Sequence, residues 1–303
     1  MYQIKKYLSL IKFSHTIFAM PFAMIGFFLG VHQFLKTDLA SSVSDQINYA
    51  LGYKFLLVIF AMVFARSAAM AFNRFLDRTF DAKNPRTAIR EIPSGVIKSK
   101  NALYFTVSCC FLFVITCYFI NPLCFYLSFL ALFIILFYSY TKRFTVWCHL
   151  VLGIGLSLAP IGAYLAVTGV FNLLPLLFSF IVLFWVSGFD IIYALQDEHF
   201  DKENKLYSIP AWLGKKRGLF VSESLHFLAL FLVLYTGYSA GFSYWYWIGS
   251  VVFCGMLVFQ HSIVKPNDLS RVNIAFMTAN GIASVVFAVF VILDLFTNTH
   301  FIN

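Results

Sequence analysis

The chain has 303 residues, of which 61% are hydrophobic and 12% are charged, about half the charged fraction of an average soluble domain. Apolar runs of about 20 residues, each long enough to cross a bilayer core of roughly 30 Å, recur along its whole length. These features exclude an ordinary soluble domain. The placement of the +9 net charge beside apolar runs also argues against a nucleic-acid partner.

The hydropathy pattern predicts one all-α membrane domain (residues 1–303), with about nine transmembrane helices in a bundle around a central cavity. The predicted spans are residues 13–35, 53–72, 102–120, 122–140, 146–168, 172–193, 219–240, 244–264 and 272–295. Lys and Arg gather in the segments between alternate spans, whereas the opposite loops hold only Lys36 and Lys54. Under the positive-inside rule, the N-terminus and the long polar segments are expected in the cytoplasm.

The first long polar segment carries polar side chains at one-turn spacing. Asn73, Asp77 and Asp81 lie at i, i+4 and i+8, which places them along one side of a helix. Carboxylates stacked in this way repel one another unless a cation lies among them. Hard oxygen ligands at this spacing suit Mg²⁺, which typically binds one or two carboxylates together with substrate phosphates.

A second acidic motif follows the sixth predicted span and contains Asp190, Asp197 and Asp201. Four predicted spans separate the two motifs, so both emerge on the same face. Two pseudo-repeated halves, roughly 1–143 and 144–303, would bring the motifs together if an axis along the membrane normal related them. A single Asp at a membrane exit is usually a solvated loop residue. Two such motifs, which hold five of the thirteen acids, instead indicate a site.

Cations accompany both motifs. Arg78 and Arg86 lie near the first, and Lys142 and Arg143 lie in a short basic link between the fourth and fifth predicted spans. A diphosphate bridged to two Mg²⁺ ions needs this mixture, because acids hold the metals while Arg and Lys neutralise the remaining oxygens. The positive-inside rule alone would also place some of these cations here.

The patterns NxxxDxxxD at 73–81, RTAIREIPSG at 86–95 and DxxYxxQDxxxD at 190–201 resemble the UbiA family of intramembrane prenyltransferases. The resemblance extends over essentially the whole chain. IKFSHTIFAMPFAMIG at 11–26 and ARSAAMAFNRFLD at 65–77 look most like bacterial 4-hydroxybenzoate polyprenyltransferases. One departure is Lys205, which stands where family members commonly have Gly four residues after the last motif Asp. This departure puts the local loop turn in doubt.

The resemblance implies a Mg²⁺-dependent enzyme of quinone biosynthesis (ubiquinone or menaquinone type) in the bacterial inner membrane, with its active site facing the cytoplasm. The enzyme would transfer a polyprenyl group from an allylic diphosphate to an aromatic acid. 4-Hydroxybenzoate is the favoured acceptor, and a naphthoate of the futalosine route to menaquinone is the alternative. The expected partners are these two substrates and the lipid bilayer.

The motifs suggest a role for each site residue. One Mg²⁺ is assigned to Asn73, Asp77 and Asp81, and the other to Asp197 and Asp201. Candidates for the diphosphate oxygens are Lys142, Arg78 and Arg86. Aromatic π faces stabilise a cation, and the rings closest in sequence to the motifs are Tyr138, Tyr140 and Tyr193.

Arg66 lies about two turns inside the span that precedes the first motif, where a charged side chain is costly and by default marks a function. We expect it to pair with the carboxylate of the acceptor; the alternative is a structural bridge to Asp190. Asp190 itself is a candidate to orient the acceptor hydroxyl or to take the ring proton.

The rival function from a different class is an ion-coupled transporter. A transporter would use intramembrane acids near the bilayer midplane, within broken helices. The acids of this chain instead gather at one face, beside long polar segments.

Overall fold

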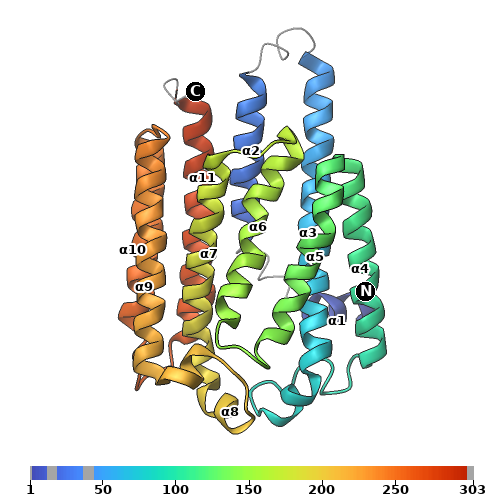
Figure 1. Ribbon diagram of the computed structural model, residues 1–303, viewed down its shortest axis with the longest axis vertical. Helices are drawn as coiled ribbons and strands as arrows, with labels where there is room; N and C mark the ends of the chain where they lie inside the picture. The colour runs from blue at the N-terminus through green and yellow to red at the C-terminus, as the bar shows by residue number, and fades with distance from the viewer. Residues whose placement is uncertain (1, 12–18, 37–43, 299–303) are drawn as a thin grey trace.

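The computed structural model describes residues 2–11, 19–36 and 44–298, and every regular element among them is a helix (Figure 1). The main helices are α1 (Tyr2–Leu10), α2 (Met20–Leu35), α3 (Ser44–Lys83), α4 (Ser99–Ile120), α5 (Pro122–Thr141), α6 (Cys148–Thr168), α7 (Leu173–Ala194), α9 (Ile209–Ser239), α10 (Tyr244–Ile263) and α11 (Asn280–Thr297). A 3₁₀ turn (Leu195–Asp197) and α8 (Glu198–Glu203) follow α7, and a π-helix (Ile274–Ala279) precedes α11.

Eight helical segments in the described part of the chain are long and apolar enough to cross a membrane, and the shorter apolar α2 accompanies them. The predicted all-α membrane fold of about nine helices is therefore confirmed. The predicted side of the N-terminus stays a prediction. The start of the first predicted span, residues 13–18, lies outside the described residues.

Two helices extend well beyond their predicted spans. At 1.5 Å per residue, the 40 residues of α3 measure about 60 Å, twice a bilayer core. The first motif therefore occupies the last turns of α3 rather than a loop. Helix α9 begins at Ile209, and its backbone changes direction at Gly214, where φ is 78° and a residue without Cβ is favoured.

The helices pack as two unequal regions. A dense aromatic core joins α2, α7, α10 and α11 around the fully buried Trp185, whose Nε1 donates to Oδ1 of Asn280 at 2.9 Å. Helices α2 and α6 approach so closely that a Cβ at Gly26 would overlap the backbone carbonyl of Pro160, so this crossing requires glycine. Among α3, α5 and α6, the packing leaves an internal cavity.

The segments that carry the two acidic motifs lie at the same end of the helical bundle. Figure 1 shows the C-terminal end of α3, the segment that follows it, the α5–α6 link and α8 together at the bottom of the view. The fold therefore gathers the polar segments at the same end, as the even number of intervening spans predicts.

Candidate active site

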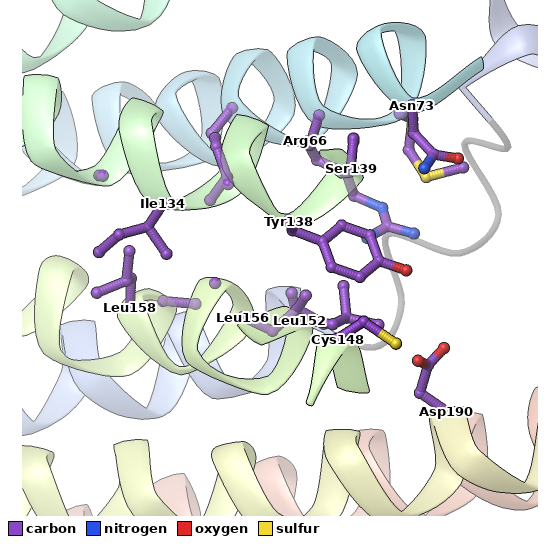
Figure 2. Close-up of a pocket in the computed structure, with 18 of the residues that line it drawn as sticks. Arg66, Asn73, Ile134, Tyr138, Ser139, Cys148, Leu152, Leu156, Leu158 and Asp190 are labelled. Atoms are coloured by element: carbon purple, nitrogen blue, oxygen red, sulfur yellow. The ribbon is translucent and has the colours of Figure 1, made fainter. Parts of the chain in front are cut away.

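A cavity of about 620 Å³ lies among α3, α5, α6 and α7. Its wall at the motif end is polar, and its wall farther along α5 and α6 is apolar, with Ile134 and Leu158 facing each other across it (Figure 2). All five motif carboxylates line this cavity: Asp77, Asp81, Asp190, Asp197 and Asp201. The two acidic motifs are thus part of one site.

The segment after α3 binds the second motif directly. Arg86 donates through Nε to Oδ1 of Asp197 at 3.1 Å and through Nη2 to Oδ2. Its Nη1 donates to the hydroxyl of Tyr193 at 2.9 Å. Asn84 adds a hydrogen bond from Nδ2 to Oδ1 of Asp197 at 3.1 Å. These contacts bring the two halves of the chain together at the site.

The α5–α6 link supplies one cation to each motif. Lys142 Nζ lies 2.8 Å from Oδ1 of Asp201, and Arg143 Nη2 donates to Oδ1 of Asp77 at 2.8 Å. Burial alone would lower the pKa of Lys142, but the Asp201 carboxylate raises it above its usual range. The link therefore holds fixed positive charge beside both acidic motifs.

The donor set fits Mg²⁺ completed by a substrate. Asp81 is 6% exposed; its Oδ1 accepts from Arg90 at 2.6 Å, while its buried Oδ2 has no hydrogen-bond partner in the part of the chain that the structure describes. Asn73 lies one turn before Asp77 on α3 and donates to its Oδ2 at 3.2 Å. Within the described residues, no three His, Cys, Asp or Glu side chains form a ready metal cluster. Mg²⁺ usually needs only one or two carboxylates beside phosphate oxygens, so the site is compatible with this ion.

A second polar group lies deeper in the cavity. Among the described residues, Arg66 Nε and Ser139 Oγ are buried without hydrogen-bond partners, and both residues line the cavity. Figure 2 shows Arg66, Tyr138 and Asp190 directed into this space from three different helices. The proposed bridge from Arg66 to Asp190 does not form among the described residues; Asp190 instead pairs with His149, whose Nδ1 lies 2.7 Å from Oδ2.

Two predicted substrate residues point elsewhere. Arg78 donates to the backbone carbonyl of Phe75 at 2.6 Å, and Tyr140 is 44% exposed and contacts Phe72. Neither lines the cavity. The geometry does not support a contact of either residue with substrate, so this role stays a prediction. Tyr193 does line the cavity, with Arg86 over its ring at 5.2 Å.

Sequence reasoning did not single out Asn84, Ser139 or His149. Asn84 could have been noticed because it continues the polar spacing of the first motif, three residues after Asp81. No sequence signal marks Ser139 or His149, because a lone hydroxyl or imidazole on an apolar helix is usually a packed side chain.

Lys205 adopts a left-handed backbone conformation with φ of 54°. This conformation favours glycine. The lysine that replaces the usual glycine of the family therefore adopts an unfavourable backbone conformation. The turn nevertheless forms. Leu206 N donates to the carbonyl of Asp201 at 2.8 Å, and Tyr207 N donates to the carbonyl of Lys142 at 2.7 Å.

Known proteins resemble this chain in sequence and in architecture. A 4-hydroxybenzoate octaprenyltransferase of Nitrosomonas europaea is 31% identical over 248 residues, which cover 80% of this chain and 83% of that protein. The solved apo structure of a UbiA homolog from Aeropyrum pernix K1 aligns with a TM-score of 0.78 and 28% identity, covering 92% of this chain and 98% of that one. A UbiA homolog from Archaeoglobus fulgidus, bound to DMAPP and Mg²⁺, shares the fold with a TM-score of 0.73 and 19% identity, covering 96% and 99%.

The family model described as the UbiA prenyltransferase family matches residues 19–285, which include both motifs and the α5–α6 link. Because this match extends over most of the chain, and because the fold and the motif pattern agree with it, the chain belongs to the UbiA prenyltransferase family.

Proposed function

We propose that this protein transfers a polyprenyl group from an allylic diphosphate to an aromatic acid, with 4-hydroxybenzoate as the first candidate acceptor. The observation that carries the proposal is a single cavity with paired acids and cations at one end and an apolar wall at the other. The names of the relatives at about 30% identity, and the DMAPP and Mg²⁺ bound to the Archaeoglobus homolog, support the same reaction.

The motif end would hold the diphosphate. Asn73, Asp77 and Asp81 of the first motif and Asp197 and Asp201 of the second would hold Mg²⁺, which when bound neutralises charge on the leaving diphosphate. Around them, Arg86, Lys142 and Arg143 hold N–H donors that can turn from the carboxylates to phosphate oxygens. Such charge-assisted hydrogen bonds strengthen as negative charge develops on the leaving group.

The apolar end would hold the isoprenoid tail. The lining follows α6 from Cys148 to Ala166, a distance of about 27 Å at 1.5 Å per residue. This distance nearly matches the thickness of a bilayer core, so the tail can lie along the membrane normal in apolar surroundings. A wall of this kind also keeps water away from the allylic cation, and Tyr138 and Tyr193 offer it π faces.

Between the two ends, Arg66 and Asp190 would hold the acceptor. The guanidinium of Arg66, whose buried Nε has no hydrogen-bond partner among the described residues, suits the acceptor's carboxylate. Asp190 is the candidate base. The C–O bond to the diphosphate breaks with its electron pair on the leaving group, a ring carbon bonds to C1 of the allylic cation, and the ring hydrogen leaves as a proton to the Asp190 carboxylate.

The membrane setting is also part of the proposal. We place the motif end at the cytoplasmic face of the bacterial inner membrane, because Lys142, Arg143 and most other basic side chains lie at that end. The organisation in two pseudo-repeated halves (1–143 and 144–303) is also part of the proposal; Arg86 and Lys142 of the first half contact the second motif.

The test is prenyl transfer by the purified protein. Geranyl diphosphate would be supplied with 4-hydroxybenzoate or with a dihydroxynaphthoate, with Mg²⁺ or with excess chelator. Product from 4-hydroxybenzoate with Mg²⁺ supports the proposal, and product from the naphthoate alone would move the assignment to the futalosine route. No product from either acceptor would overturn the proposal, and turnover in excess chelator would overturn its metal requirement.

A second arm of this test examines the acceptor site. Arg66→Ala should raise KM for the acceptor while leaving KM for geranyl diphosphate unchanged. An unchanged KM for the acceptor would contradict the assignment of Arg66.

A further inference from the structure

We infer that His149 is a positioning residue that aims one carboxylate oxygen of Asp190 at the acceptor. This inference rests on the proposed function and deepens it, because it names the group that prepares the base. His149 is the second residue of α6, is 2% exposed and lines the cavity beside Asp190.

Two hydrogen bonds fix the tautomer of His149. The backbone N–H of Ile209, the first residue of α9, donates to Nε2 at 3.3 Å. A backbone amide cannot accept a proton in return, so Nε2 must present its lone pair. In the neutral ring the hydrogen then resides on Nδ1, which donates it to Oδ2 of Asp190 at 2.7 Å. Both ring nitrogens are used, and the ring cannot turn without losing one of the bonds.

As a result, only one oxygen of the Asp190 carboxylate is held by a hydrogen bond. Oδ2 accepts from His149, and Oδ1 has no hydrogen-bond partner among the described residues. Because Asp190 lines the cavity, Oδ1 is the oxygen left for a ligand (Figure 2). The acceptor proton would therefore go to Oδ1.

The pairing also distinguishes Asp190 from the other four motif acids. Each of those acids is in contact with a permanently charged side chain: Asp77 with Arg143, Asp81 with Arg90, Asp197 with Arg86 and Asp201 with Lys142. A fixed cation favours the ionised carboxylate and so weakens it as a base. A neutral imidazole orients Asp190 without this full charge, which suits a proton acceptor.

The alternative is that His149 only joins helices, because its two bonds link α6 to α7 and to α9. Two substitutions separate the roles, since each keeps one bond. In His149→Asn, the side-chain amide reaches the position of Nδ1 and can still donate to Asp190. In His149→Gln, the longer amide reaches the position of Nε2 and can still accept from Ile209.

We expect His149→Asn to retain kcat within a few-fold. We expect His149→Gln to lose roughly 10²-fold in kcat, the lower range for a general base, with KM for both substrates unchanged. The melting temperature in detergent would show that both variants are folded. The reverse order, with the Gln variant active and the Asn variant impaired, would overturn the inference, as would equal activity of the two variants.

Asp190→Asn provides the matched background. If His149 acts through Asp190, adding His149→Gln to Asp190→Asn should cause no further loss of kcat. The same loss in both backgrounds would contradict the inference. Wild-type turnover separates the two proposals: an inactive wild type overturns the proposed function and this inference with it, whereas an active wild type with the wrong variant pattern overturns the inference alone.

Discussion

Arg86 holds the carboxylate of Asp197 with two donors, although 111 residues separate them in sequence. The pair joins the segment after α3 to the turn after α7, and the Arg86 side chain is 32% exposed while that of Asp197 is 13% exposed. The Asp197 carboxylate and the Tyr193 hydroxyl raise the pKa of Arg86 despite its burial, so this guanidinium stays charged. Arg86 is therefore a permanently charged group beside the proposed diphosphate site.

The first prediction compares Arg86 with Arg78. Arg86→Ala should lower kcat/KM for the allylic diphosphate by about 10²-fold, because a positive group with N–H donors beside the proposed diphosphate is lost. Arg86→Lys should retain part of the activity, since it keeps the charge but not the two-donor geometry. Arg78→Ala removes a cation outside the cavity and should change kcat/KM less than about twofold. A larger loss for Arg78→Ala than for Arg86→Ala would reverse this assignment.

The second prediction concerns the unpaired Oδ2 of Asp81. In the wild type, Mg²⁺ together with geranyl diphosphate should raise the melting temperature in detergent, because ligands that bind only the folded state stabilise it, by about 2.7 kcal/mol at 100 times Kd. Asp81→Asn should abolish most of this increase while leaving the ligand-free protein folded.

The control for Asp81→Asn is Asp268→Asn. Asp268 accepts hydrogen bonds from Ser270 outside the membrane helices, which lower the pKa of its carboxyl, and it does not line the cavity. Its variant should show the wild-type increase in melting temperature. A full ligand-induced increase in Asp81→Asn would argue against Asp81 as a metal ligand.

Local patterns were sufficient to predict much of this protein. Apolar runs predicted the membrane helices, because each must satisfy its backbone internally and cross a fixed thickness. Helical spacing placed Asn73, Asp77 and Asp81 on one side of a helix, and α3 does continue through them to Lys83. The two motifs were predicted to lie together, and the five motif acids do line the same cavity.

Side-chain partners could not be predicted in the same way. Arg78 directly follows Asp77, but adjacent residues on a helix face different directions, so proximity in sequence does not place Arg78 in the cavity. The contact between His149 and Asp190 depends on how α6 and α7 pack, and no local pattern contains that information. The same holds for Ser139, whose buried Oγ lines the cavity without a hydrogen-bond partner among the described residues.

The third prediction uses the left-handed turn at Lys205. A non-glycine residue in this conformation costs about 1–2 kcal/mol, partly offset by the greater freedom of glycine in the unfolded chain. Lys205→Gly should therefore raise the free energy of unfolding by up to about 1 kcal/mol. Lys216→Gly, at an exposed position within α9, should lower it by about 1 kcal/mol. Chemical unfolding in detergent would measure both changes, and a destabilised Lys205→Gly would show that the lysine side chain has a stabilising contact.

The fourth prediction concerns the length of the isoprenoid. Gly162 lines the cavity about 21 Å along α6 from Cys148, and a Cβ at this position would meet no atom within 4 Å. Gly162→Leu should therefore fill the far part of the cavity without a clash in the unliganded protein. A donor of two isoprene units is too short to reach this depth, so kcat/KM for geranyl diphosphate should be retained.

A donor of eight isoprene units should lose at least about tenfold in kcat/KM, within the range by which an apolar pocket discriminates between substrates of different size. Gly255→Leu is the matched control, because Gly255 also has open space around its Cβ position but lies on α10 outside the cavity. The ratio of the two products, formed from mixed donors, would measure the effect directly. If Gly162→Leu left this ratio at the wild-type value, the long tail could not follow α6, and it would have to leave the cavity between helices nearer to the motif end.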